Sequence, residues 1–168
     1  MPFRKIQAAL YIVALTGSSV SANELTWNGA GDGTSFGDTA NWDGTPAGGS
    51  IDMNALVDDF VIDDPSACIG CPGGVAQISW ADTAVGSLTM SGGEIGGATG
   101  IRYTTLNLSG GTMTRQFLLE VTATVSGEAT LKLNGGGNPL NLSTIALESV
   151  GATVHFADDE YDHGPILL

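Results

Sequence analysis

The sequence predicts an all-β protein, and three observations support that prediction. Short segments alternate apolar and polar residues with a period of two, which is the pattern of a half-buried strand. The 168 residues include 25 glycines, too many for a helical protein, and no window beyond the N-terminal region has helical periodicity. Valine, isoleucine, leucine and threonine, which are common in strands, supply much of the remaining pattern.

The alternating segments recur and end at pairs of glycines. Residues 87–93 read SLTMSGG, residues 105–111 read TLNLSGG, and residues 130–136 read TLKLNGG. Each copy has two apolar residues separated by one polar residue, then a small polar residue and a glycine turn. Regular glycine corners favour a short right-handed parallel β-helix (β-solenoid), in which successive strands stack as a ladder. A β-sandwich with the same strands is the alternative.

In such a ladder, the apolar residues of each strand face inward and their polar neighbours face outward. The apolar positions of the repeats predict this interior: Leu88, Met90, Leu106, Leu108, Leu131, Leu133, Leu140, Leu142, Ile145 and Leu147.

The N-terminus has the pattern of a secretory signal peptide. Arg4 and Lys5 precede an apolar run over residues 6–15, and small residues continue to Ala22. That run is too short to span a bilayer, which needs roughly 20 residues. We therefore expect a signal peptide at 1–22, an N-terminal capping segment with a disulfide loop at 23–84, and solenoid repeats with an acidic tail at 85–168.

The predicted mature chain is strongly acidic. Three basic residues, Arg102, Arg115 and Lys132, stand against 18 acidic ones, a formal net charge of −15. A surface of this charge repels phosphate backbones and anionic headgroups, so we expect neither nucleic acid nor a membrane span. Divalent cations are compatible with it, but solubility of a secreted protein explains the charge equally well.

The first mature segment carries a turn-rich loop after a predicted strand at residues 25–27. Residues 28–33 read NGAGDG, and Asp32 and Asp38 are candidate calcium ligands because hard cations take several oxygen ligands on a sharply turning backbone. The spacing is not that of an EF-hand. The alternative is that Asp and Gly make turns while Trp27 and Trp42 cap one end of the core, and we favour this alternative.

This segment resembles the opening of many bacterial secreted β-solenoid proteins. The resemblance rests on TWNG at 26–29, Asp32-Gly33, ANWDG at 40–44, Pro46, and Asp52 before an apolar strand. Those proteins commonly continue into autotransporter-associated or similar glycine-rich repeats, and residues 131–142 are similar to such a repeat. The resemblance implies surface display or adhesion. It also implies a structural capping role for Trp27, Asn41 and Trp42, with no catalytic residue carried over.

Four carboxylates lie around a predicted strand that ends at Ile62. They are Asp58, Asp59, Asp63 and Asp64. Residues that share a face would stand about 13–20 Å apart at 3.3 Å per residue, too far for paired glycosidase carboxylates. We expect these residues to form a solvated strand edge that resists unwanted pairing.

The two cysteines, Cys68 and Cys71, are separated by two residues and are followed by Pro72. In an exported protein this pair predicts a small disulfide clip. Haem attachment would need a histidine in place of Pro72. Zinc would need two distant further ligands, and redox chemistry would need a βαβ pattern that the sequence lacks.

Two further features are candidate ligand sites. Trp80 follows an alternating segment and is either a core aromatic or a platform on which a sugar ring stacks. Asp158, Asp159 and Asp162 cluster near the C-terminus as candidate metal ligands, although an acidic tail is the commoner explanation.

The sequence contains no convincing catalytic constellation. We expect a noncatalytic extracellular structural or adhesive protein without a cofactor, which self-associates or contacts cell-surface or matrix polymers. If one end of the ladder is uncapped, end-to-end assembly into a fibre follows. A carbohydrate- or calcium-binding module is the alternative. A polysaccharide-active enzyme is least supported, because a lyase needs basic groups and Arg102, Arg115 and Lys132 are the ones on offer.

Overall fold

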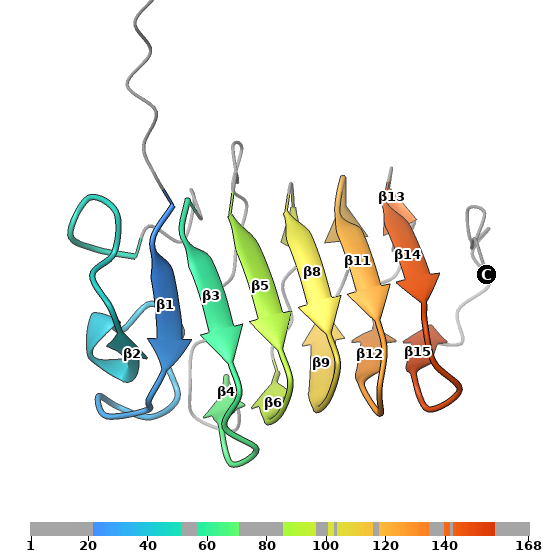
Figure 1. Ribbon diagram of the computed structural model, residues 1–168, viewed down its shortest axis with the longest axis horizontal. Coiled ribbons are helices and arrows are strands. Elements are labelled where there is room, and N and C mark those ends of the chain that lie inside the picture. The colour runs from blue at the N-terminus through green and yellow to red at the C-terminus, as the bar shows by residue number, and fades with distance from the viewer. Residues whose placement is uncertain are drawn as a thin grey trace, which may run out of the picture.

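The computed structural model is all-β, as predicted. It comprises fifteen short strands and one 3₁₀ turn, η1 (Thr39–Asn41), among the residues that it describes (Figure 1). Those residues are 22–51, 57–70, 86–96, 101–102, 104–115, 118–134, 140–141 and 143–156.

The largest sheet has seven strands in the order β14-β11-β8-β5-β3-β1-β2. Every neighbouring pair is parallel except β1 with β2, which is antiparallel. The strands are β1 (Glu24–Trp27), β2 (Trp42–Asp43), β3 (Asp59–Ile62), β5 (Ser87–Met90), β8 (Thr105–Leu108), β11 (Thr122–Val125) and β14 (Thr144–Leu147).

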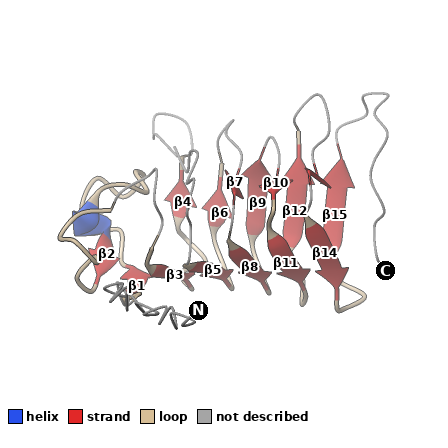
Figure 2. Ribbon diagram, turned by 90° about the horizontal axis from the view of Figure 1, so that it is seen from above, coloured by secondary structure: helices blue, strands red, loops and turns tan. Residues whose placement is uncertain are grey.

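Two further sheets contain parallel pairs throughout. The five-stranded sheet, in the order β15-β12-β9-β6-β4, is formed by β4 (Cys68–Ile69), β6 (Glu94–Ile95), β9 (Thr112–Arg115), β12 (Thr130–Leu133) and β15 (Thr153–Phe156). The three-stranded sheet is formed by β7 (Ile101–Arg102), β10 (Leu118–Leu119) and β13 (Leu140–Asn141). Viewed from above, the seven-stranded and five-stranded sheets form two rows along the molecule (Figure 2).

The chain visits the three sheets in a fixed order. From β5 onward it places one strand in the seven-stranded sheet, one in the five-stranded sheet and one in the three-stranded sheet, then repeats. Successive repeats lie in register, so Ser87, Thr105, Thr122 and Thr144 are neighbours in one row. The predicted boundary at residue 85 does not interrupt this arrangement, because β3 pairs with β5 as the later strands pair with one another.

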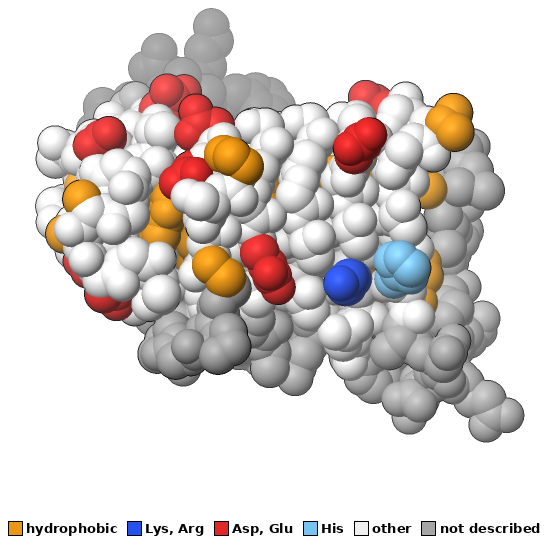
Figure 3. All heavy atoms as spheres, turned by 90° about the horizontal axis from the view of Figure 1, so that it is seen from below, with side chains coloured by type: hydrophobic (Ala, Val, Ile, Leu, Met, Phe, Trp, Pro, Cys, Tyr) orange, Lys and Arg blue, Asp and Glu red, His pale blue; other side chains and the backbone are white. Residues whose placement is uncertain are grey.

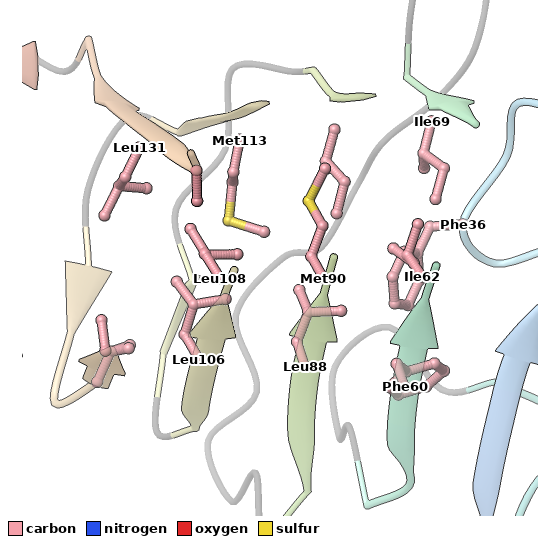
Figure 4. Close-up of a cluster of buried hydrophobic side chains, with 14 of the residues drawn as sticks. Phe36, Phe60, Ile62, Ile69, Leu88, Met90, Leu106, Leu108, Met113 and Leu131 are labelled. Carbon is pink, nitrogen blue, oxygen red and sulfur yellow. The ribbon is translucent and has the colours of Figure 1, made fainter. Parts of the chain in front are cut away.

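The inward side chains of the strands form one continuous apolar core (Figure 4). The predicted interior residues Leu88, Met90, Leu106, Leu108, Leu131, Leu133 and Ile145 are all buried. Leu147 is partly buried, and the side chains of Leu140 and Leu142 lie outside the described residues. Core residues that the repeat pattern did not single out include Phe36, Ile95, Met113, Leu118 and Val121.

The corners between strands stack as regularly as the strands do. After β8, the Ser109 N–H donates to the Met90 carbonyl at 2.8 Å, and after β11 the Ser126 N–H donates to the Leu108 carbonyl at 2.7 Å. Gly127 follows with φ +57°, and a Cβ there would collide with the Ser109 carbonyl oxygen. A glycine at this corner is therefore required both by backbone conformation and by the close approach of the preceding corner.

The third copy of the repeat does not occupy the place that the sequence pattern suggested. Residues 130–133 form β12 in the five-stranded sheet, whereas residues 87–90 and 105–108 form β5 and β8 in the seven-stranded sheet. The next strand in the row of β5 and β8 is β11, which reads TATV. A four-residue alternation fixes which side chains point inward but not which sheet the strand joins.

The expectation of a solvated edge around β3 is wrong. β3 is an internal strand between β1 and β5, and Asp58 is 3% exposed, with its carboxylate accepting from the backbone N–H groups of Asn23 and Ala47 at 3.1 Å. Asp59 accepts from the Ser87 N–H and hydroxyl at 2.8 and 2.7 Å. Asp64 accepts from Ser66 in the following turn, and the hydroxyl of Ser66 is the main cause of a lowered pKa of Asp64.

Candidate binding surfaces

The N-terminal end of the ladder is closed by the loop between β1 and β2, which is organised by a buried asparagine. Asn41 is 0% exposed. Its Oδ1 accepts from the N–H groups of Gly31 and Gly33, both at 2.9 Å. Its Nδ2 donates to Asp32 Oδ1 at 2.8 Å and to the Ser35 carbonyl at 3.0 Å. One side chain thus supplies the hydrogen bonds that the turning backbone cannot make with itself.

The two aspartates predicted as calcium ligands serve the same loop. Asp32 accepts from the hydroxyl and N–H of Ser35, from the N–H of Thr34 and from Asn41. These hydrogen bonds, the Ser35 hydroxyl first, hold the pKa of Asp32 well below its usual value. Asp38 accepts from the N–H groups of Ala40 and Asp32 at 3.0 and 3.2 Å. Among the described residues, no group of three or more His, Cys, Asp or Glu side chains is placed to hold a metal ion.

An aromatic cluster closes the core beneath this loop. The ring of Trp42 packs edge-on against Trp27, Phe36 and Phe60, with ring centroids 4.9–5.0 Å apart. Trp42 also donates from Nε1 to the Phe36 carbonyl at 2.8 Å, so its polar atom is satisfied although the residue is buried. Trp27 and Trp42 face each other across the antiparallel β1–β2 pair, which ends the seven-stranded sheet.

The opposite end of the ladder is built differently. In the described part of the chain, β14 and β15 are each the last strand of their sheet. The N–H groups of Thr144 and Glu148 donate to the carbonyls of Val121, next to β11, and Val125, at the end of β11, each at 2.9 Å. Because alternate residues of a strand turn their backbone groups to opposite sides, those of Ile145 and Leu147 face away from β11. Leu147 and Val154 pack against the core but are only partly buried.

The outer face of the seven-stranded sheet carries a regular array of small polar side chains. We call the eight outward residues of β5, β8, β11 and β14 the hydroxyl face. The first row is Ser87, Thr105, Thr122 and Thr144, and the second row is Thr89, Asn107, Thr124 and Ala146. All eight are at least partly exposed, and none is charged or aromatic. The sequence analysis did not predict this face. The pattern that could have indicated it is a hydroxyl residue followed two positions later by a second small or polar residue, repeated in successive strands.

The outer face of the five-stranded sheet differs from the hydroxyl face in charge. Within the seven-stranded sheet, carboxylates enter the first row beyond β5, at Asp59 of β3 and Glu24 of β1. Lys132 of β12 lies in register with His155 of β15, and both are exposed. Figure 3 shows a basic side chain next to a histidine on the face that it draws. Glu94 lies exposed on β6, in register with Thr112. This face therefore combines threonines with charges of both signs.

One basic residue lies where no outside ligand can reach it. Arg115 ends β9 with its side chain 0% exposed among core residues. Its Nη1 donates to the carbonyls of Gly96 at 2.9 Å and Thr114 at 3.2 Å, while Nε and Nη2 have no hydrogen-bond partner among the described residues. Burial lowers the pKa of Arg115 to about 10, so the guanidinium remains charged at neutral pH. A role for Arg115 in contacting substrate does not fit this burial.

The remaining predicted site residues fall mostly outside the described part of the chain. Cys68 is disulfide-bonded, but its predicted partner Cys71 is not described, so that pairing stays a prediction. The same holds for the signal peptide up to residue 21, and for the candidate ligands Trp80, Asp158, Asp159 and Asp162.

Among the described residues, no helix has the length and apolar character needed to cross a bilayer. Comparisons of this chain with models of protein families, with curated proteins and with solved structures find no match.

Proposed function

We propose that this protein is a noncatalytic, secreted structural or adhesive module built as a short right-handed β-solenoid. Parallel, in-register pairing and a fixed order of three sheets support the solenoid. A sandwich of hairpin-connected strands would instead contain mostly antiparallel pairs, and the described part of the chain contains one, β1 with β2. The right hand follows from the general preference of parallel crossover connections.

The single observation that carries the functional proposal is the difference between the two ends. At the N-terminal end, β2, the Asn41 loop and the aromatic cluster cover the last strand. At the C-terminal end, the outward backbone groups of Ile145 and Leu147 form a strand edge next to partly buried apolar side chains. Such an edge is a template for pairing with another chain.

The occupant that we propose for this edge is the same edge of a second copy. Two C-terminal ends related by a twofold axis would pair β14 with β14 in antiparallel fashion and bury Leu147 and Val154 of both copies. At the N-terminal end the seven-stranded sheet ends in the two-residue antiparallel strand β2, which is shorter than the four-residue β14, so we expect this pairing to stop at two copies. Growth into a longer fibre would require the β1–β2 cap to open.

The association state of the mature protein tests this proposal. Size-exclusion chromatography with light scattering, and negative-stain images, should give a concentration-dependent dimer about twice as long as the monomer. Leu147→Lys places a charge at the apolar end and should give a monomer. Ala146→Lys is the matched control because its side chain points to the outer face of the same strand, and it should still dimerise.

A clean monomer at high concentration would refute the pairing. Equal loss of the dimer in both variants would show that the end itself is not the interface. Thermal unfolding of the monomeric variant checks that Leu147→Lys leaves the ladder folded.

A further inference from the structure

The hydroxyl face is a two-dimensional array with fixed repeat distances. In-register parallel strands set a spacing of about 4.8 Å along each row, and residues two apart on a strand set about 6.6 Å between the rows. Four strands, β5, β8, β11 and β14, contribute one residue each to both rows. They lie side by side in Figure 1.

All but one of the hydroxyls of this array are left unused by the fold, the exception being Ser87, which donates to Asp59 at 2.7 Å. In the described structure, the hydroxyls of Thr89, Thr105, Thr122, Thr124 and Thr144 make no hydrogen bond to protein atoms. Hydroxyls at the corners behave differently: the corner residues Thr104, Ser109, Ser126 and Ser149 donate to backbone carbonyls of the preceding repeat. The fold thus uses its corner hydroxyls for internal bonds and presents the strand threonines to the surroundings.

The array is also uncharged in a protein of formal net charge −13. None of its eight residues is ionisable, whereas the five-stranded sheet presents Glu94, Lys132 and His155. An uncharged face fits a neutral ligand, because an ionic one would be bound through complementary charge. The face also has no aromatic ring to stack against a sugar. A flat ligand that repeats over a few ångströms and is made of hydrogen-bonding groups alone is crystalline water.

We propose that the hydroxyl face binds ice. Each threonine offers one hydroxyl, which donates and accepts, and one methyl group, which restricts the orientations of neighbouring water. Rows of such groups hold surface water at the spacing of the strands, and water held in this way hydrogen-bonds onward into the crystal. Adsorption of the folded, rigid face then blocks further growth of the crystal where the protein sits.

The test is an ice recrystallisation assay, with thermal hysteresis and crystal shape, on the full mature chain. We expect wild type to shape crystals and to suppress recrystallisation. Thr122→Lys, in the middle of the first row, should need at least about tenfold more protein for the same effect. Thr130→Lys is the matched control, since Thr130 points outward from the five-stranded sheet, and it should keep the wild-type effect.

The proposal is overturned if the wild-type protein has no effect on ice. It is also overturned if Thr122→Lys and Thr130→Lys lose the effect on ice equally while both unfold at the wild-type temperature. If the wild-type protein has no effect on ice but binds crystalline cellulose or chitin, and Thr122→Lys does not bind, the ligand of the face is a polysaccharide instead. The ice assay is repeated on the monomeric Leu147→Lys variant. This measurement separates a failure of the ice-binding proposal from a failure of the proposal that two copies pair end to end.

Discussion

The two ends of the ladder solve the same physical problem in different ways. At each end, the last strand of each sheet has backbone groups that need hydrogen-bond partners, and the apolar core behind it needs to be covered. The N-terminal end satisfies its backbone through Asn41 and Asp32 and seals its core with four aromatic rings. The C-terminal end has the strand edge of β14 and the partly buried Leu147. In the described structure, one end is thus closed by a specific loop, whereas the other ends in a strand edge, for which we propose association.

The largest expected effect comes from removing the aromatic seal. Trp42→Ala deletes contacts with Trp27, Phe36 and Phe60, leaves a cavity and removes the hydrogen bond to the Phe36 carbonyl. We expect a loss of about 3–5 kcal/mol in the free energy of unfolding, measured by urea denaturation. The control is Val150→Ala at the other end, where the side chain is fully exposed and the change should stay within about 0.5 kcal/mol. If Trp42→Ala and Val150→Ala lower the free energy of unfolding by similar amounts, the two ends do not differ in this way.

The treatment of buried polar groups also separates the N-terminal part from the rest. Asn41 and Asp58 are buried and hydrogen-bonded, whereas Arg115 is buried with Nε and Nη2 unpaired. Arg115→Met keeps the length of the side chain and removes the charge, so we expect a gain of about 1–4 kcal/mol in the free energy of unfolding. Arg115→Lys, which keeps a buried charge, should show no such gain. A loss of stability in the methionine variant would mean that the guanidinium has a partner outside the described residues.

Asn41 tests how much of the N-terminal closure depends on one side chain. Asn41→Ala leaves the N–H groups of Gly31 and Gly33 without their acceptor, and we expect a cost of about 1–3 kcal/mol in chemical denaturation. Asn134→Ala is the control, because Asn134 is exposed and its side chain makes no hydrogen bond in the described structure. Increased protease cleavage within residues 28–41 of the Asn41 variant would place the damage in the loop. No change in either readout would contradict the role of Asn41.

The smallest expected effect is a dependence on acid. The pKa of Asp32 in the folded protein lies below its usual value of 3.8, so the unfolded chain takes up a proton first as the pH falls. The contribution of Asp32 to stability is therefore complete above that value and is lost progressively below it. Asp32→Asn should flatten the stability curve between about pH 4 and pH 2 relative to wild type. A stability curve of Asp32→Asn that falls as steeply as that of wild type over this range would contradict this role of Asp32.

The all-β class could be predicted, and seven of the ten predicted interior residues are buried, because alternation decides which side chains point inward. The same rule applies to Arg115: its spacing of two from Met113 places it inward, although charged side chains ordinarily lie at the surface. The sheet to which β12 belongs could not be predicted. Residues 130–133 and 105–108 have the same pattern, and what separates them is the path of the chain between corners.

The roles of the acidic residues were the least predictable part. Asp32 and Asp38 offer oxygen atoms on a tight turn, and both calcium and backbone N–H groups use such atoms. Asp58 looked like an edge charge because its partners, the N–H groups of Asn23 and Ala47, are at least 11 residues away in the sequence. Only the folded chain brings donor and acceptor together.

Because whole repeats stack in register, the length of the molecule increases in fixed steps with the number of repeats. In all three sheets, the strands of each repeat pair with those of the repeat before it and the repeat after it. In the solenoid that we propose, a segment from one corner to the equivalent corner of the next repeat could therefore be duplicated or deleted without altering either end. Every duplication extends the protein by about 4.8 Å and adds one more outward pair of side chains. Duplication or deletion would thus set the length of the proposed solenoid and the area of its hydroxyl face in discrete steps, while the end strands β2 and β14 stay as they are.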